Sequence, residues 1–406
     1  MKTHLSNTLA IEGGSPVRKN PLPPRINFCD CELEMVKRVF QNSWKLGKDF
    51  FSQGKFEDEF TEKYCEFQGG GYADAVSSGT SAVYIAFKAL DIEPDSDVIV
   101  SPTTNPGGIM PIALQNVKLI IPDSEPNSFN ISPKEFEKAI TPKTRAAVLT
   151  HLGGHVIDLD PIIDIAKSKG IKIVEDCSQA HGATYKGKKV GTLTEISASS
   201  TMCSKTLTSG GNGGLVYTKN EKLYWHARSL ADRGRPFQGP NTHFRMTTNY
   251  LYPALNHNSD ELSCAMGISS LQKLQSTINR RYIIAKKIDE SLKVSKVVSP
   301  ANLEIPNSKP SVFFHTVVVD IDRLKVSKVQ FANAIIAEGI NINADFRDIT
   351  CEWDWIPKYM REYKRTPNSI DFRNRSFNIL FNENFGEAEI EDIINSILKV
   401  EKFYVK

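Results

Sequence analysis

The sequence has no apolar run of about 18 residues and no apolar segment near its start, so it offers neither a membrane-spanning helix nor a secretion signal. Its 7 cysteines are scattered and form no Cys-x-x-Cys pair, which excludes a disulfide framework and ordinary zinc-ligand spacing. Charge of one sign is not in excess either, because 50 basic and 47 acidic residues are interspersed. We therefore expect a cytoplasmic protein without a membrane, nucleic-acid or metal partner, whose function lies in local sites.

The length of 406 residues favours two domains, and an apolar fraction of 40% allows sizeable cores. Residues 1–30 are rich in glycine and proline, so we expect an arm without regular structure that lies over the body. A large domain is predicted over residues 31–262 and a smaller C-terminal domain over residues 263–406.

Strands and helices alternate through the first half of the chain, which predicts an α/β fold with a mostly parallel sheet covered by helices on both faces. The last third has a different order of predicted strands and helices, which indicates a small α+β domain. Two amphipathic helices are expected over residues 31–68, and strands over 98–100, 117–121, 146–152, 171–176 and 215–218; the small domain is expected to contain strands 313–321 and 340–344 and helices 327–339 and 387–404.

Two side chains in the middle of the chain point to chemistry. An apolar run ends in Asp176, which predicts a buried strand that presents a carboxylate at the edge where open α/β sheets bind ligands. Lys205 follows in a segment of small, hydroxyl-bearing and glycine residues, where backbone can approach a bound molecule. This pair suits pyridoxal 5′-phosphate: the amine forms a Schiff base with the cofactor aldehyde, and the carboxylate keeps the pyridine nitrogen protonated.

A third candidate is the stretch Ser78-Gly79-Thr80-Ser81, which follows a short strand and precedes a periodic helical segment. Free N–H groups and the positive end of a helix dipole at such a point bind phosphate. The same residues also fit an ordinary helix N-cap without any ligand. The residues alone leave both interpretations open.

Further residues surround Asp176 and Lys205: Glu175, the run 179–187, Ser200 and the pair Gly213-Gly214. Together they resemble the DegT/DnrJ/EryC1/StrS family of sugar aminotransferases, a branch of the fold-type-I pyridoxal-phosphate enzymes. The resemblance runs over most of the chain. It implies a large cofactor-binding domain with a mostly parallel sheet sandwiched by helices, and a smaller α+β domain after it.

The resemblance also implies roles for single residues, and it favours Ser78, Gly79, Thr80 and Ser81 as the cofactor-phosphate cradle. It implies that Ser200 bonds the same phosphate and that Gln179 contacts the cofactor rather than only a loop. It implies that Asn256 reaches the phosphate of the other subunit of a homodimer, whereas a polar turn without such a role is the alternative. His181 is expected to pack against Asp176 and orient it, by analogy with residues that support metal ligands.

The chain departs from the family pattern at two loops. Many members carry an aromatic that stacks on the cofactor ring where this chain has 102–108, without an aromatic; Asn105 and Pro106 are the nearest counterparts. His151 and His155 lie in the second loop, and a structural hydrogen bond and a place in the substrate pocket are about equally supported for them.

The resemblance implies an aminotransferase that moves an amino group from glutamate or glutamine to a keto-sugar or keto-cyclitol. The acceptor is expected to be nucleotide-linked, in amino-sugar, surface-polysaccharide or natural-product biosynthesis, and set by loops near 151–155, 228–250 and 345–365. The alternatives are a dehydratase of the same family, in which a histidine replaces the Schiff-base lysine, an amino-acid lyase or decarboxylase, and a non-enzymatic regulatory protein. Lys205 is present, which argues against the dehydratase.

Overall fold

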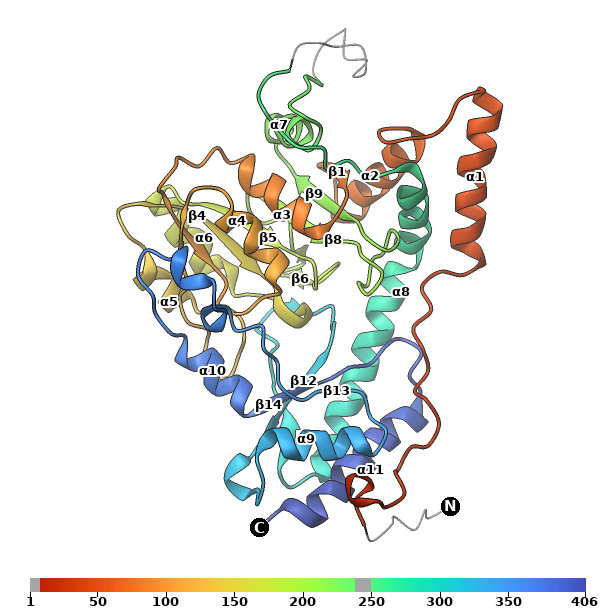
Figure 1. Ribbon diagram of the computed structural model, residues 1–406, viewed down its shortest axis with the longest axis vertical. Helices are drawn as coiled ribbons and strands as arrows, with labels where there is room; N and C mark the ends of the chain where they lie inside the picture. The colour runs from red at the N-terminus through yellow and green to blue at the C-terminus, as the bar shows by residue number, and fades with distance from the viewer. Residues whose placement is uncertain (1–7, 238–249) are drawn as a thin grey trace.

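The computed structural model describes residues 8–237 and 250–406. Figure 1 shows a larger α/β part and a smaller α+β part, with the long helix α8 (Glu261–Ser291) running along both. The first half of α8 packs with α1 (Asp30–Leu46) and α2 (Lys55–Gln68). Its second half belongs to the core of the smaller part. The predicted domain boundary after residue 262 falls inside this unbroken helix. The division of the chain into two domains at that residue therefore stays a prediction.

The larger part is built on a seven-stranded sheet in the order β1-β9-β8-β5-β4-β2-β3. Its centre is parallel, whereas β9 (Gly214–Thr218) runs antiparallel between β1 (Tyr72–Val76) and β8 (Ile196–Ser200). The carboxyl ends of the parallel strands meet at one edge, and this edge carries the candidate site.

Alternation along the central strands explains why helices cover both faces of this sheet. In β4 (Thr144–Thr150), Val148 packs into one core with α3 (Gly79–Lys88), and the adjacent Leu149 packs into the opposite core with α6 (Leu159–Lys169). Successive side chains of a strand point to opposite faces, so apolar residues at every position demand cover on both sides. The sheet is therefore fixed between two helical layers.

The smaller part is a four-stranded antiparallel sheet in the order β10-β12-β14-β13. It packs against α9 (Lys328–Ala337), α11 (Glu387–Tyr404) and the end of α8. The described part of the N-terminal arm contributes Leu9 to this core. The arm then runs along the molecule from the smaller part to α1, as Figure 1 shows.

The other helices and strands complete the two parts. The helices are α4 (Met110–Ala113), α5 (Pro133–Ala139), α7 (Glu221–Ala231) and α10 (Pro367–Asn374). The strands are β2 (Asp97–Val100), β3 (Lys118–Ile120), β5 (Lys172–Asp176), β6 (Thr184–Tyr185), β7 (Lys188–Lys189), β10 (Val298–Pro300), β11 (Ser308–Lys309), β12 (His315–Val319), β13 (Ile342–Asn343) and β14 (Ser376–Ile379).

The structure corrects the predicted elements in a few places. The strand β8 was not predicted, because its sequence is mostly serine and carries no apolar run. The expectation that the arm has no regular element was wrong at Ala10–Glu12, a single 3₁₀ turn that ends at the left-handed Gly13. The strand expected at 340–344 is confined to β13.

We examined whether any helix could span a membrane. Over residues 8–237 and 250–406, none of the helices combines the length and the apolar character that crossing a bilayer requires.

Candidate active site

The first wall of the site is the start of α3. Ser78 caps this helix, since its hydroxyl accepts from the N–H of Ser81 at 3.0 Å. A Cβ on Gly79 would lie 2.4 Å from the Cβ of Ser200 at the end of β8, so only glycine allows this approach. The first amides of a helix have no intrahelical acceptor and face the positive end of its dipole. The start of α3 and Ser200 together form a cradle suited to phosphate.

Asp176 lies at the end of β5, at the carboxyl edge of the sheet, and its side chain is buried. One carboxylate oxygen accepts from the N–H of Ser178 at 3.0 Å, and the other lies 3.4 Å from the hydroxyl of Thr150. A Cβ on Gly108 would stand 3.0 Å from that second oxygen. The carboxylate therefore sits in a tight, polar corner formed by Thr150, Ser178 and Gly108.

Lys205 lies in the loop between β8 and β9 and is 9% exposed. Burial lowers the pKa of its amine, while the carboxylates of Asp176 and Asp348 act in the opposite direction. The ammonium lies 4.7 Å from the centre of the Phe313 ring. A lysine amine with a lowered pKa is more often neutral, as a nucleophile or a base needs.

These groups line one cavity of about 430 Å³. It brings together the predicted residues Ser78, Gly79, Thr80, Asn105, Asp176, Gln179, Ser200 and Lys205. Ser81 does not line it, because its hydroxyl lies 3.0 Å from those of Ser77 and Ser78 at the helix start.

Asn256 also lies outside this cavity. Its side chain is exposed and accepts from the backbone and side-chain nitrogens of Asn258, at 3.2 and 2.9 Å. Its backbone pairs with that of Asp232 beyond α7. Asn256 therefore does not line the cavity, although the carbonyl of the next residue, His257, accepts from the N–H of Ser77 beside the cradle at 2.7 Å.

Gln179 faces the cavity, and its side-chain oxygen accepts from the N–H of Gly153 at 2.8 Å. Gly153 has a φ of +64°, and a Cβ there would lie 3.0 Å from the ring of Phe314. This left-handed turn needs glycine and leaves the amide nitrogen of Gln179 available to a ligand.

The expected contact between His181 and Asp176 was wrong. His181 is buried, and its Nε2 lies 2.8 Å from the carbonyl oxygen of Ser200, so it supports the phosphate cradle instead. Burial lowers the pKa of His181 to about 4, with the nearby Lys205 acting in the same direction. The imidazole is therefore neutral at pH 7.

His151 and His155 line other parts of the molecule. His151 is fully buried; its Nε2 lies 3.1 Å from Glu175, and its Nδ1 accepts from the N–H of Ile157. His155 lines a separate cavity of about 140 Å³. The structure thus favours the structural role for His151.

His151, Glu175 and Cys177 form a cluster with atoms close enough for a metal ion. The Glu175 carboxylate already accepts from the backbone N–H groups of Gly191 and Leu193, at 2.7 and 3.1 Å. These bonds and His151 keep its pKa low against the effect of burial. The cluster is therefore explained as a structural network beneath the sheet edge.

Sequence reasoning missed the aromatic rings of the site. Phe313, Phe314 and Phe346 line the cavity, and all three come from the last third of the chain. The sequence offered only a weak signal, the adjacent pair Phe313-Phe314 at the start of a predicted strand. Asp348 was also missed as a single residue, although the loop 345–365 was expected to set the acceptor.

The sequence profile of the DegT/DnrJ/EryC1/StrS aminotransferase family matches residues 32–398. The chain belongs to this family. GDP-perosamine synthase of Escherichia coli O157:H7 is 28% identical to it, over 92% of this chain and 95% of that protein. The solved aminotransferase from Psychrobacter cryohalolentis is 25% identical with a TM-score of 0.85, over 93% of this chain and 98% of its own.

The same fold is found in another member of the structural neighbourhood, the E coli GDP-4-keto-6-deoxy-D-mannose-3-dehydratase, solved with bound hydrated PLP. It is 20% identical, with a TM-score of 0.83 over 93% of this chain and 99% of its own. The comparisons confirm the family, the fold and the enzyme class predicted from the sequence and, at the level of the family, the cofactor.

Proposed function

We propose that this protein is a pyridoxal-phosphate-dependent aminotransferase that transfers an amino group from glutamate or glutamine to a nucleotide-linked keto-sugar. The observation that carries the proposal is the single cavity faced by Lys205, Asp176 and the start of α3. The name of the GDP-perosamine synthase relative supports a nucleotide-linked sugar. The proposed setting is the cytoplasm, where exposed thiols such as those of Cys29 and Cys31 stay reduced.

The residues of the cavity fit the cofactor group by group. The start of α3 and Ser200 would hold its phosphate, Gln179 would offer an amide N–H, and Asp176 would accept a hydrogen bond from the protonated ring nitrogen. When bound, the cofactor supplies an electron sink that stabilises negative charge at the carbon carrying the amino group. The tight corner between Gly108 and Thr150 keeps the Asp176 carboxylate aimed at one donor.

Lys205 supplies the proton transfers. In the resting enzyme its Nζ would hold the cofactor. Once freed, the neutral amine would take the proton from the donor carbon and deliver it to the cofactor carbon that Nζ had held. Burial favours the neutral amine that this step needs. The rings of Phe313, Phe314 and Phe346 line the same cavity, and that of Phe313 lies 4.7 Å from the amine, so these apolar rings would limit the water around it.

The purified protein tests the proposal directly. It should be yellow, and glutamate or glutamine should bleach the visible band as the amino group moves to the cofactor. Borohydride should link the cofactor covalently to Lys205 in the resting enzyme but not in the bleached enzyme, as peptide mapping would show. A colourless protein that binds no cofactor, or cofactor fixed on another lysine, contradicts the proposal.

A dehydratase is the nearest rival, and product mass separates the two reactions. An aminotransferase given a keto-sugar and glutamate yields an amino-sugar and 2-oxoglutarate. A dehydratase yields a sugar that has lost water. Retention of Lys205 favours the first result, because a histidine replaces this lysine in the dehydratase branch of the family.

We also infer a homodimer in which Asn256 of each chain completes the phosphate site of the other. Asn256 is exposed outside its own cavity, as a shared residue would be. Exposed apolar side chains on α1, Leu33, Trp44 and Leu46, offer surface for a second copy. In the isolated chain, neither the exposed Asn256 side chain nor these apolar side chains of α1 would need a function.

Subunit complementation tests this inference. Lys205→Ala and Asn256→Ala proteins are mixed and allowed to exchange chains, so that a mixed dimer contains one intact site. Activity should then rise above that of either parent. A monomer by ultracentrifugation, or exchange without recovery, contradicts the shared site.

A further inference from the structure

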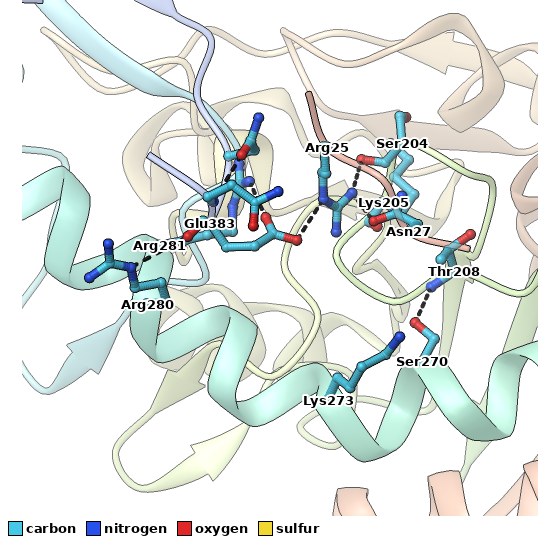
Figure 2. A network of polar contacts seen from close by, with 12 residues as sticks. Arg25, Asn27, Ser204, Lys205, Thr208, Ser270, Lys273, Arg280, Arg281 and Glu383 are labelled. Carbon is cyan, nitrogen blue, oxygen red and sulfur yellow. Dashed lines mark hydrogen bonds and ion pairs between the residues drawn. The ribbon is translucent and has the colours of Figure 1, made fainter. Parts of the chain in front are cut away.

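The loop that carries Lys205 is held from outside by side chains of the N-terminal arm. Asn27 donates its amide to the carbonyl of Cys203. Arg25 donates from Nη1 to the carbonyls of Ser204 and Lys205, at 3.0 and 2.8 Å, as Figure 2 shows in part. The consecutive carbonyls of Cys203, Ser204 and Lys205 thus accept from side chains of arm residues 23–27, which we call the strap. In a regular strand, a neighbouring strand would supply these donors.

The other side of the strap is held by a loop of the smaller part, residues 382–384. Asn382 donates to the carbonyl of Pro23 at 2.9 Å, and Asn384 donates to that of Pro24 at 3.0 Å. Between them, Glu383 accepts from Nε of Arg25 at 2.9 Å. The strap is therefore a tie between the loop 382–384 and the lysine loop.

Glu383 is also connected to the side-chain amine of Lys205, through Arg281 and Phe313. Its other oxygen accepts from Arg281 on α8 at 3.1 Å, and Figure 2 shows Glu383 between the two guanidinium groups. Arg281 is buried and donates to the carbonyl of Phe313 at 2.6 Å. The ring of Phe313 is the one that lies 4.7 Å from the Lys205 ammonium. The backbone and the amine of Lys205 are thus both connected to Glu383.

This arrangement matters because proton transfer depends strongly on placement. An amine that must take a proton from one atom and return it to another loses rate when its position is displaced by about 1 Å. The pair of arginines with Glu383 is largely shielded, with side chains of Arg25, Glu383 and Arg281 16%, 20% and 4% exposed. Such a pair is costly to break on one side, so it favours one geometry.

We propose that Arg25 and Glu383 are positioning residues that fix the lysine loop and transmit the position of the loop 382–384 to Lys205. The inference rests on the proposed function for the role of Lys205. It concerns residues that touch neither the cavity nor a substrate, because Arg25 and Glu383 do not line the cavity. Movement of the smaller part relative to the strap would displace the catalytic amine through these contacts.

The test compares Arg25→Gln with Arg18→Gln. Arg18 lies on the same arm and donates to Asp392 at 2.8 Å and to the carbonyl of Pro21 at 3.0 Å, but it does not contact the lysine loop. Hydrogen exchange of amides 201–208 in the cofactor-free full chain is measured first. We expect about tenfold faster exchange in Arg25→Gln and no change in Arg18→Gln, because the loss of the two hydrogen bonds to the loop together weakens local protection by about that factor.

The loaded enzyme gives the second readout. Arg25→Gln should slow the bleaching half-reaction with glutamate about tenfold at unchanged KM, and should move the pH at which the visible band of the bound cofactor changes. Arg25→Lys should recover part of both, since a lysine reaches one carbonyl. Glu383→Gln should show a smaller effect than Arg25→Gln, because Arg25 then keeps its bonds to the lysine loop.

Equal exchange and equal half-reaction rates in Arg25→Gln and Arg18→Gln would overturn the proposal. If Arg25→Gln does not fold, Arg25→Lys and Glu383→Gln decide it, and wild-type values in both would overturn it equally. Failure of the proposed function has a different signature: the wild-type protein would then show no borohydride-fixed cofactor on Lys205.

Discussion

Asp176 and Lys205 face the same cavity, yet the molecule positions them by different means. Asp176 is the last residue of β5, whose parallel pairing with β4 and β8 fixes its direction through backbone hydrogen bonds. Lys205 sits in an irregular loop whose carbonyls accept from Arg25 and Asn27. Regular structure therefore positions the Asp176 carboxylate, whereas side chains from the strap position the loop of Lys205.

The difference fits the two tasks. The carboxylate only has to stay in place and hold a proton on one atom, which a rigid sheet edge does well. The lysine must be attached, released and returned during each transfer, so its loop needs a defined but adjustable position. A tie through Glu383 to the smaller part provides such a position.

The largest effect should come from removing the amine. Lys205→Ala should lower transamination at least about a thousandfold, because both covalent attachment and proton transfer are lost, while the cofactor still binds by its phosphate. Steady-state rates and cofactor content measure this. Lys273→Ala is the control, since Lys273 pairs with Glu32 at 2.5 Å and does not line the cavity. Turnover of more than a few per cent in Lys205→Ala would remove the basis of the comparison.

The next effect concerns the sheet edge. Asp176→Asn should slow the glutamate half-reaction about a hundredfold with cofactor still bound, because a neutral amide does not stabilise the protonated ring nitrogen. Stopped-flow absorbance follows the reaction. Hydrogen exchange of β5 should stay as in the wild type, since the sheet rather than the carboxylate fixes this residue. Wild-type rates in Asp176→Asn would show that another group protonates the ring.

A smaller effect is expected in stability at acid pH. The pKa of His181 is about 4 in the folded chain and 6.5 in the unfolded chain. Between these pH values the unfolded chain binds a proton that the folded chain excludes. Stability from this group is complete above pH 6.5 and is lost as pH falls toward 4, by about 2 kcal/mol at pH 5. Urea unfolding at pH 7 and pH 5 measures it. His181→Gln, which does not titrate, should show a pH dependence weaker by that amount; an unchanged pH dependence would contradict the assignment.

The smallest effect sharpens the description of Lys205. Asp348 favours the charged lysine, so Asp348→Asn should lower the pKa of Lys205 further. The pH dependence of reductive methylation of Lys205 in the cofactor-free protein measures the shift. Asp345→Asn is the matched control, because the Asp345 carboxylate pairs with Arg347 at 3.1 Å and does not line the cavity. A shift upward would mean that Asp348 does not face the amine.

Much of the larger part was predictable because its signals are local. Apolar runs marked the central strands, and Gly79 with Ser78 marked the helix start that forms the cradle. The strand β8 was missed because serine replaces the apolar residues that usually mark a buried strand. His181 was placed near the correct strand end, but its partner proved to be the Ser200 carbonyl rather than Asp176.

The sequence by itself determined the end of β5 at Asp176, the glycine at the start of α3 and a lysine among small residues, because these features depend on neighbours along the chain. Only the tertiary structure decided how Lys205 is positioned. Arg25 lies 180 residues from Lys205 and 358 from Glu383 along the chain. No local pattern encodes such contacts, since an arginine in a proline-rich arm looks like any solvated charge until the fold brings unpaired carbonyls to it.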